Sequence, residues 1–144
     1  MDDLWVGSEP IDLAKATAGL GDESLGGVAV FLGRVRSPNA GQAVHYLDYE
    51  GYDEMILAEM AAIAAELRAA HGPLRVAIHH RLGRLHPGEV SLAVAVAAQH
   101  RAAALAACSA GVEAVKLRLP VWKLEVGAEG SSYVAGSTGA AEAL

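Results

Sequence analysis

The segment from His100 to Glu125, HRAAALAACSAGVEAVKLRLPVWKLE, joins an alanine-rich stretch to a short alternating stretch through a proline. Alanine has the highest helix propensity, so residues 102–117 are predicted to form a long helix. Apolar residues recur in it at spacings of three and four, which predicts one buried face made of Leu105, Cys108, Val112 and Val115. We therefore expect this helix to pack in the core of the protein.

Pro120 ends this helix, because proline lacks the backbone N–H and disfavours helical angles at the residue before it. The residues that follow, Val121 to Val126, alternate in character and predict a strand with Lys123 and Glu125 on the same face. Lys116 is thus expected at the end of the helix and Lys123 near the start of the strand.

Lysine is scarce in this chain, which contains eight arginines and three lysines. Two of the three, Lys116 and Lys123, flank the proline. A lysine amine shifts its pKa readily in a dry pocket or beside another cation, which suits a nucleophile, a proton carrier or a carboxylate-binding group. The alternative is that Lys116 only complements the negative end of the helix and that Lys123 is a solvated strand residue.

The composition favours a single domain that binds a small molecule or a protein. At 144 residues the chain is long enough for one hydrophobic core, and no linker or repeat divides it. Its net charge of −6 and its lack of dense lysine and arginine clusters argue against a nucleic-acid-binding groove. Charged residues interrupt every apolar stretch of membrane-spanning length, and the acidic N-terminus lacks the apolar core of an export signal. We expect a cytoplasmic protein that binds neither nucleic acids nor membranes.

Cys108 is the single cysteine, which rules out an internal disulfide and a metal site with several cysteines. Because it lies on the apolar face of the predicted helix, we favour a buried, unreactive thiol. A sulfurtransferase that carries sulfur on Cys108 as a persulfide is the alternative.

Hydrophobic periodicity predicts the remaining elements of an α/β domain. Helices are expected at 10–20 and 53–70, strands at 26–36, 43–51, 74–82, 90–98 and 131–135, a flap-like loop at 37–42 and a turn at 83–89. The second helix has an apolar stripe made of Ile56, Met60, Ile63 and Leu67. The strand at 26–36 is apolar on both faces, which predicts a central, buried position. Tyr49 is expected to be a packing group whose hydroxyl is hydrogen-bonded.

Two pairs of polar residues bear on ligand binding. Arg34 and Arg36 are two residues apart and share one face, where each is either an anion ligand or a solvated strand end. His79 and His80 are adjacent in a strand and point to opposite faces, which argues against a shared zinc site. No metal and no other cofactor is expected.

The two ends of the long helix both suit anions, but they cannot share a site within one chain. His100 and Arg101 lie at its start, where backbone N–H groups and the helix dipole favour negative charge, and Lys116 lies near its end. At 1.5 Å of rise per residue the two ends are roughly 22 Å apart. Since a two-fold dimer can bring one helix start to the other helix end, we predict a composite site shared by two copies.

Five motifs occur in order along the chain: FLGRVR (Phe31–Arg36), YLDYEGYDEM (Tyr46–Met55), HRLGRLHPGE (His80–Glu89), HR (His100 and Arg101) and KLRLPVWKLE (Lys116–Glu125). Over residues 26–133 they resemble the MoaE family, the large, catalytic subunits of molybdopterin synthase. Each motif alone is weak, but their shared order and spacing make the resemblance specific.

The resemblance implies an α/β hammerhead fold with additional antiparallel strands, here a single domain at residues 1–136 followed by a loose tail at 137–144. It also implies a central homodimer whose chains each bind a small ubiquitin-like subunit, giving a heterotetramer. The C-terminal Gly-Gly tail of the small subunit carries a thiocarboxylate, which gives its sulfur to cyclic pyranopterin monophosphate. Two such transfers form the dithiolene of molybdopterin, so the implied activity is that of a sulfurtransferase in molybdenum cofactor biosynthesis.

By the same resemblance, Lys116 and Lys123 are the catalytic residues beside the thiocarboxylate. The substrate-binding residues that it implies are Arg36, Phe31, Glu125 and, from the second copy, His100 and Arg101. A buried thiocarboxylate needs cationic partners, and a phosphate favours the forked donors of arginine. We hypothesise that Lys116 polarises the thiocarboxylate carbonyl, that Lys123 handles protons or charge at the pterin, and that Glu125 orients Lys123.

The sequence departs from the family pattern at three positions. Leu105 stands where the family often has phenylalanine, and Val112 stands where a longer side chain such as methionine occurs. Ser137 aligns with a common arginine near the C-terminus, so one expected anion ligand is missing. The candidates to replace it are Arg34, His45 and Arg84.

A non-catalytic module is the alternative function. Such a module binds a ubiquitin-like tail or a phosphate ligand without turnover, and its lysine pair serves only to bind a carboxylate.

Overall fold

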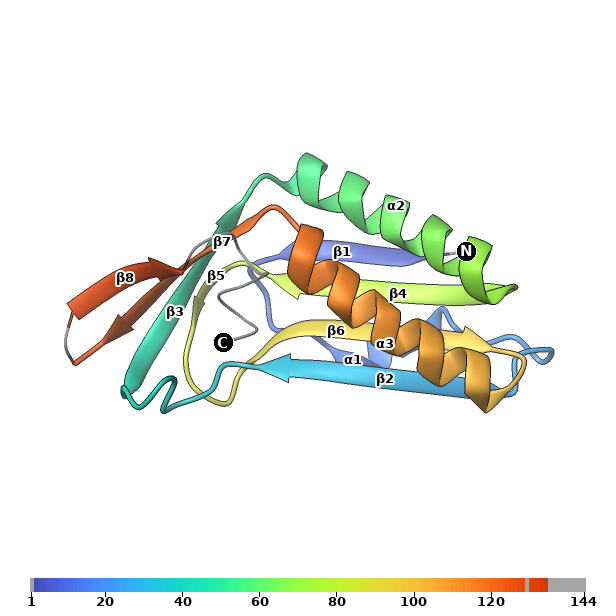
Figure 1. Cartoon of the computed structure of the whole chain (residues 1–144), viewed down its shortest axis with the longest axis horizontal. Helices are drawn as coiled ribbons and strands as arrows, with labels where there is room; N and C mark the ends of the chain where they lie inside the picture. Colours follow the sequence, from blue (N-terminus) through green and yellow to red (C-terminus); the bar gives the residue numbers. More distant parts are fainter. Residues whose placement is uncertain (1, 129, 135–144) are drawn as a thin grey trace.

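The computed structural model describes residues 2–128 and 130–134, which form two four-stranded sheets and three helices (Figure 1). In chain order the elements are β1 (Asp3–Gly7), α1 (Leu13–Ala18), β2 (Gly27–Arg34), β3 (Val44–Gly51), α2 (Asp53–His71), β4 (Leu74–Arg81), β5 (Gly83–Leu85), β6 (Val90–Ala98), α3 (Arg101–Arg118), β7 (Val121–Gly127) and β8 (Gly130–Val134). The predicted α/β class with additional antiparallel strands is confirmed. Ser137 and the tail expected at residues 137–144 lie outside the described residues.

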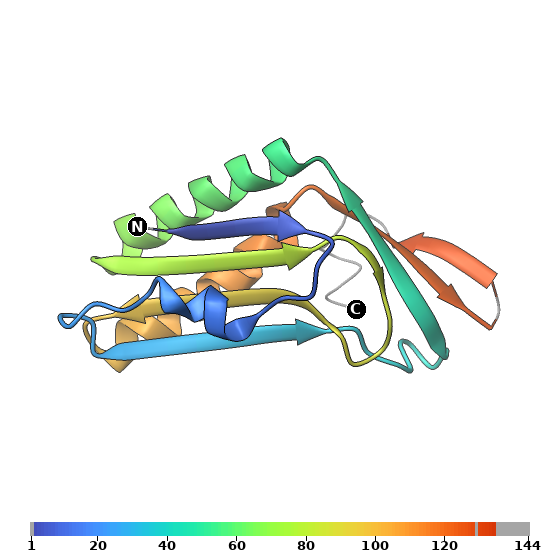
Figure 2. The same cartoon turned by 180° about the vertical axis from the view of Figure 1, so that it is seen from behind.

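The larger sheet has the strand order β1-β4-β6-β2, with β1 parallel to β4 and the other neighbours antiparallel. Helices α2 and α3 lie side by side on one face of this sheet (Figure 1), and α1 lies against the other face (Figure 2). Because helices cover both faces, most residues of the central strands β4 and β6 are buried on both sides. The hydrophobic core therefore surrounds this sheet.

The smaller sheet has the order β5-β3-β7-β8 and is antiparallel throughout. It extends from one end of the larger sheet (Figure 1). Helix α3 leads into β7 through Pro120, and the Val121 N–H donates a hydrogen bond to the Leu119 carbonyl at 2.8 Å. The predicted order of helix, proline and strand is confirmed, and it places the end of α3 at the junction of the two sheets.

The two long helices differ in how well their buried faces were predicted. Helix α2 buries the predicted stripe, none of whose four side chains is more than 5% exposed. Helix α3 buries the predicted Cys108 and Val115, but it leaves Leu105 62% exposed and Val112 half-buried, and Ala104, Ala107 and Gly111 complete its buried face. These small residues allow close packing, since a Cβ at Gly111 would lie 3.2 Å from Leu67 of α2 and 3.4 Å from Val94 of β6. Periodicity alone does not distinguish the predicted face of α3 from the observed one. The two faces share Cys108 and Val115, and Ala104 and Gly111 are each one residue before the predicted Leu105 and Val112.

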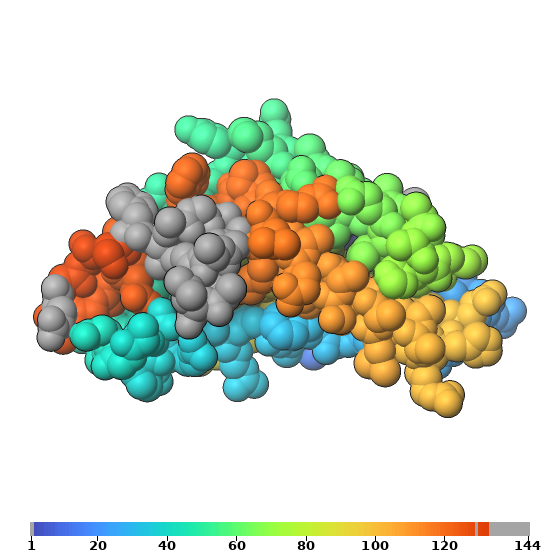
Figure 3. Space-filling model, in the orientation of Figure 1, coloured from blue at the N-terminus to red at the C-terminus, as the bar shows by residue number. Residues whose placement is uncertain are grey.

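Strand β2 is an edge strand, which corrects the prediction of a central, buried strand at 26–36. Among the described residues its one partner is β6, and Val28, Val30 and Phe31 are 55%, 43% and 37% exposed. Helix α3 reaches the surface between α2 and β2 (Figure 3). The apolar character of both faces of β2 therefore reflects an apolar surface beside α3.

Strands β1 and β5 lie where the sequence predicts none, and α1 is shorter than the helix predicted at 10–20. Next to β1, the carboxylate of Asp2 accepts two hydrogen bonds from Arg68 of α2, at 2.6 and 2.7 Å. Strand β5 lies within the turn expected at 83–89 and pairs with β3. Both strands are short and pair with segments distant in the sequence, so local periodicity does not reveal them.

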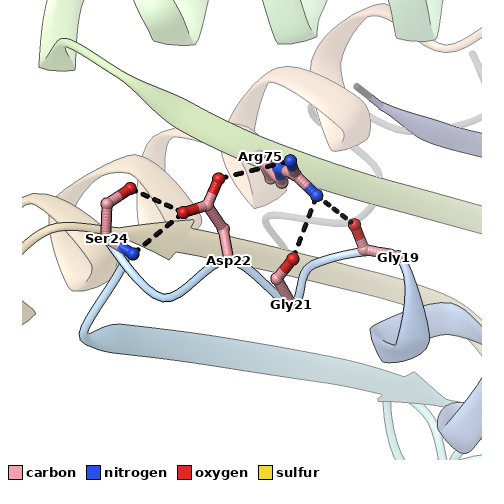
Figure 4. Close-up of polar contacts among 5 residues, drawn as sticks. All are labelled: Gly19, Gly21, Asp22, Ser24 and Arg75. Carbon is pink, nitrogen blue, oxygen red and sulfur yellow. Dashed lines mark hydrogen bonds and ion pairs between the residues drawn. The ribbon is translucent and has the colours of Figure 1, made fainter.

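Arg75 on β4 anchors the connection between α1 and β2 (Figure 4). Its guanidinium donates hydrogen bonds to the carbonyls of Gly19 and Gly21, at 3.3 and 3.1 Å, and lies 3.2 Å from the Asp22 carboxylate. That carboxylate accepts hydrogen bonds from the hydroxyl and the backbone N–H of Ser24, which lower the pKa of Asp22 together with the charge of Arg75. The connection is thereby fixed to the larger sheet.

No helix among the described residues is long and apolar enough to cross a membrane.

Candidate active site

A cavity of about 320 Å³ lies where the smaller sheet meets the end of the larger sheet. Its walls come from the end of β2 and the loop after it, from β3, β6 and β7, and from the end of α3. Five of the seven residues predicted for the site line this cavity: Lys116, Lys123, Arg36, Phe31 and Glu125.

Strands β3 and β7 supply one wall of the cavity. Their register places Tyr49 opposite Lys123 and Leu47 opposite Glu125. Directly opposed residues in antiparallel strands share one face of the sheet, and so do residues two apart in one strand. The four side chains therefore form one surface, and all four line the cavity.

A second part of the lining includes Arg34 and Arg36. Strand β2 ends at Arg34, where a shift in the register after Gly33 interrupts the regular pairing with β6. Beyond the strand, the Val35 N–H donates a hydrogen bond to the Glu89 carbonyl at 2.9 Å, which fixes the backbone between the two arginines. Both arginines line the cavity.

Lys116 and Lys123 reach this cavity from the two sides of the Pro120 turn. Lys123 is only 8% exposed, and its burial and the charge of Lys116 lower its pKa to about 8. Glu125 opposes this shift, whereas Arg36 adds to it. Burial also lowers the pKa of Lys116. The alternative that Lys123 is a solvated strand residue is therefore wrong, and its amine is able to exchange a proton near neutral pH.

His80 on β4 contacts Tyr49 in an edge-to-face arrangement, with ring centroids 5.3 Å apart. Burial lowers the pKa of His80 to about 4, with further lowering by Lys116 and Lys123 and opposition from the Arg81 carbonyl. Nδ1 lies 2.9 Å from that carbonyl oxygen, which only accepts hydrogen bonds, so Nδ1 carries the hydrogen of the neutral ring. His80 therefore adds no positive charge to the lysine pair at neutral pH.

His79 lies on the other face of the larger sheet, as the alternation of strand residues predicts. Its ring centroid is 5.7 Å from that of Trp5, and its Nε2 is 3.2 Å from the carboxylate of Asp3. Within residues 2–128 and 130–134, no group of three or more histidine, cysteine, aspartate or glutamate side chains is arranged to hold a metal ion.

His100 and Arg101 do not line the cavity. Both are exposed at the N-terminal end of α3, whereas Lys116 lies near its C-terminal end. The structure thus keeps these two predicted residues apart from the other five within one chain, as the helix length requires.

Arg34 lines the cavity, unlike the other two candidates to replace the missing arginine. The Arg84 guanidinium stacks on the Tyr46 ring at 3.8 Å and donates two hydrogen bonds to Asp48, at 3.0 and 3.2 Å. His45 is exposed and lies outside the cavity lining. Of the three candidates, Arg34 is therefore the one that lies at the cavity.

Cys108 lies outside this cavity and borders a separate groove between α3 and β2. It is 6% exposed, its Sγ lies 3.7 Å from the Val94 carbonyl oxygen, and burial raises the pKa of its thiol. A thiol that stays protonated is a poor sulfur carrier. These observations favour the unreactive thiol over the persulfide alternative.

The lining also includes residues that were not predicted for the site, among them Asn39, Leu47 and Ser91. Tyr49 is 8% exposed, which confirms its expected packing role, although it also lines the cavity; burial raises the pKa of its hydroxyl, and the neighbouring Ser91 opposes this rise. Asn39 lies in a loop and Ser91 in an otherwise apolar strand. A single polar residue in a buried apolar strand was the available signal for Ser91.

Residues 6–118 match the family model described as MoaE protein. A molybdopterin synthase catalytic subunit of Pyrococcus abyssi is 41% identical over 128 residues, which cover 89% of this chain and 86% of that protein. A protein of the same name in Drosophila willistoni is 39% identical over 88% of this chain, which spans only 34% of that longer protein.

Solved structures share this fold. The crystal structure of molybdopterin synthase from Staphylococcus aureus has a TM-score of 0.86 and 31% identity, with 89% of this chain and 93% of that chain covered. A complex of subunits 1 and 2 of molybdopterin-converting factor from Helicobacter pylori has a TM-score of 0.71 over 95% of this chain and 92% of that chain. Its identity is 19%, so it shows a likeness of fold alone.

Proposed function

The chain belongs to the MoaE family, and from this we infer that it is the catalytic subunit of a molybdopterin synthase, a sulfur-transferring enzyme of molybdenum cofactor biosynthesis. The observation that carries this conclusion is that Lys116, Lys123 and Arg36 line one cavity at the junction of two sheets. Three cationic side chains around one cavity suit two anionic ligands, a thiocarboxylate and a phosphate.

The sulfur donor in this proposal is a small ubiquitin-like subunit whose C-terminal Gly-Gly tail ends in a thiocarboxylate. Glycine has no side chain, so such a tail can bring its terminal group into a narrow cavity by main chain alone. The sulfur acceptor is cyclic pyranopterin monophosphate. Family membership and the charge of the cavity support both assignments.

Lys116 and Lys123 are proposed to act at different atoms. Lys116 polarises the thiocarboxylate carbonyl while the sulfur bonds to a carbon of the substrate. The bond from sulfur to the carbonyl carbon then breaks, and water supplies the oxygen that leaves a carboxylate on the tail. Lys123, with a pKa of about 8, transfers protons at the pterin. Two such rounds, each with a new tail, deliver the two sulfurs of the dithiolene.

The remaining lining residues hold the substrate and the lysines. Arg36 binds the phosphate, because a guanidinium offers paired donors to phosphate oxygens. Phe31 provides an apolar wall beside the pterin, and Glu125 orients Lys123 from two residues along the same strand.

His100 and Arg101 are proposed to complete the substrate site from a second copy of the chain. Two observations support this: they are exposed at the far end of α3, and apolar side chains such as Val28 and Leu105 are exposed on β2 and α3. Two catalytic chains and two small subunits then form a heterotetramer. We also propose that the enzyme works in the cytoplasm, where a reducing environment preserves thiols.

Reconstitution tests this function. The purified chain is mixed with a thiocarboxylated small subunit and cyclic pyranopterin monophosphate, and molybdopterin is assayed. Replacing Lys116 or Lys123 by alanine is expected to slow single-turnover product formation by about 100-fold. Lys15→Ala, in α1 and outside the cavity lining, is the matched control.

The outcomes separate the two functions. Wild-type rates in both lysine variants end the assignment of these residues as catalytic. A wild-type chain that binds the tail but forms no product supports the non-catalytic module.

A further inference from the structure

Asn39 connects two walls of the cavity through its side-chain amide. Its Oδ1 accepts a hydrogen bond from Arg36 at 3.1 Å, and its Nδ2 donates one to the Glu125 carboxylate at 2.9 Å. Arg36 follows β2, whereas Glu125 lies on β7, 86 residues from Asn39 in the sequence. All three side chains line the cavity. The Asn39 amide therefore connects Arg36, which is proposed to bind the phosphate, with Glu125, whose carboxylate is the nearest one to Lys123 along β7.

The position of Asn39 is set by a tight turn. Asn39 and Gln42 exchange backbone hydrogen bonds of 2.8 and 3.0 Å, and the two residues between them have φ angles of 51° and 81°. Two successive positive φ angles are characteristic of the type I′ turn that suits hairpins. The Ser37 hydroxyl also accepts a hydrogen bond from the Val44 N–H, at the start of β3. The segment expected to be a flap is thus a bonded turn that carries Asn39.

An amide is the group that fits between these two partners. A guanidinium only donates hydrogen bonds and a carboxylate only accepts them. Asn39 meets both requirements with one orientation of its amide, because Oδ1 faces Arg36 and Nδ2 faces Glu125. An aspartate at this position would repel Glu125, and a leucine of similar size would bond with neither partner.

We infer that Asn39 is a positioning residue of the sulfur-transfer site, which holds Glu125 toward Lys123 and fixes the guanidinium of Arg36 for the substrate. The inference rests on the proposed function of this cavity. Arg36 uses one N–H for Asn39 and has further donors for an anion. Asn39 therefore orients the guanidinium without occupying it.

The charge balance at Lys123 makes this role measurable. The titratable and charged groups that influence or line its surroundings are Lys116 of α3, Arg36 and Arg34 at the end of β2, Glu125 of β7, Tyr49 of β3 and His80 of β4. Of these, Glu125 is the one that stabilises the ammonium form, against burial, Lys116 and Arg36. When the Asn39 amide is removed by substitution, the Glu125 carboxylate loses this hydrogen bond and is able to turn to solvent. The pKa of Lys123 should then fall.

The test is a pH titration of Lys123 in the chain without partner or substrate. The titration is monitored by the NMR signal of the carbon next to the amine, in protein made with lysine labelled at that carbon. The Lys123 signal is assigned by its absence from Lys123→Arg. The wild-type midpoint is expected near 8. Asn39→Leu and Glu125→Gln should each lower this midpoint by about one pH unit. The midpoint of the double variant should be no lower than that of either single variant. Gln42→Leu, an amide-to-apolar change in the same turn, should leave the midpoint unchanged.

Kinetics provide a second readout. With reconstituted enzyme, Asn39→Leu should raise the KM for the pterin substrate about tenfold, because the Arg36 guanidinium loses its fixed orientation. A wild-type midpoint for Lys123 in Asn39→Leu, alongside a lowered midpoint in Glu125→Gln, overturns the inference. The titration needs no partner or substrate, so it tests the role of Asn39 independently of activity. Failure of the wild-type chain to make molybdopterin would instead overturn the proposed function.

Discussion

Tyr49 and Lys123 lie directly opposite each other on β3 and β7, and both are buried at the wall of the cavity that Lys116 also lines. Burial removes the Lys123 amine from water, and the second amine, that of Lys116, adds positive charge. Both effects disfavour the ammonium form. The pairing of these two strands therefore creates the conditions for a lysine that titrates near neutral pH.

Lys123 is expected to give sulfur transfer a pH dependence. Its ammonium form prevails below its pKa of about 8, so the single-turnover rate constant should fall as the pH rises through that value. Lys123→Arg keeps the positive charge but cannot release a proton in this pH range, so it should react about 100-fold more slowly than the wild type and without this fall. Rate constants measured from about pH 6 to pH 10 test this, and a flat wild-type profile contradicts it.

The Tyr49 and Ser91 side chains both line the cavity and interact, since Ser91 opposes the rise that burial causes in the pKa of Tyr49. Tyr49→Phe and Ser91→Ala are each expected to lower the free energy of unfolding by about 1 kcal/mol, because each removes one hydroxyl of this pair; Ser91→Ala also removes the bond that Ser91 donates to the Gly33 carbonyl at 3.4 Å. The double variant should lose little more than either single variant. Urea unfolding of the four proteins measures the coupling. Fully additive losses would show that the two hydroxyl groups act independently.

Gly51 allows β3 to approach the Pro120 turn closely. A Cβ at this position would lie 2.9 Å from the Pro120 carbonyl oxygen and 2.7 Å from the Ile56 side chain. Gly51→Ala should therefore lower the free energy of unfolding by about 1–3 kcal/mol. It should also slow sulfur transfer, since the turn joins α3, which carries Lys116, to β7, which carries Lys123. Gly19→Ala, where nothing lies within 4 Å of the added atom, is the control. Equal stability of the two variants would refute this packing argument.

His80 should make folding sensitive to mild acid. Its pKa is about 4 in the folded chain, against 6.5 for an ordinary histidine. Between these values the unfolded chain binds a proton that the folded chain does not, so the free energy of unfolding decreases as the pH falls from 6.5 towards 4. The contribution amounts to about 3 kcal/mol.

His80→Gln should flatten this part of the stability profile, because glutamine does not titrate. The control His45→Gln removes an exposed histidine instead. Denaturant unfolding at several pH values compares the two variants with the wild type. A profile for His80→Gln as steep as that of the wild type is the contrary result.

The proposed dimer site is tested by mixing subunits. Lys116→Ala and Arg101→Ala chains are each expected to be nearly inactive, because each disables one component of both composite sites. Mixed dimers restore one intact site and should recover up to about half of the activity per dimer. Differently tagged chains allow the mixed dimers to be isolated. If they show no more activity than the parents, His100 and Arg101 do not act across a dimer.

Several features follow from local sequence. The proline between Lys116 and Lys123, the apolar stripe of α2 and the alternation in β7 are set by backbone periods of 3.6 and 2 residues, which operate in any globular context. The five ordered motifs likewise gave the family. Hence the fold class and five of the residues that line the cavity were predicted without coordinates.

Other features depend on which segments meet. Small residues let α3 turn Leu105 outward, β2 lies at a sheet edge, and Asn39 reaches Glu125 across 86 residues of sequence. The lowered pKa of Lys123 likewise requires its burial beside Lys116 and Arg36. Local periodicity states which residues share a face of a helix or strand. Burial and charge depend on what packs against that face, and the tertiary structure alone decides this.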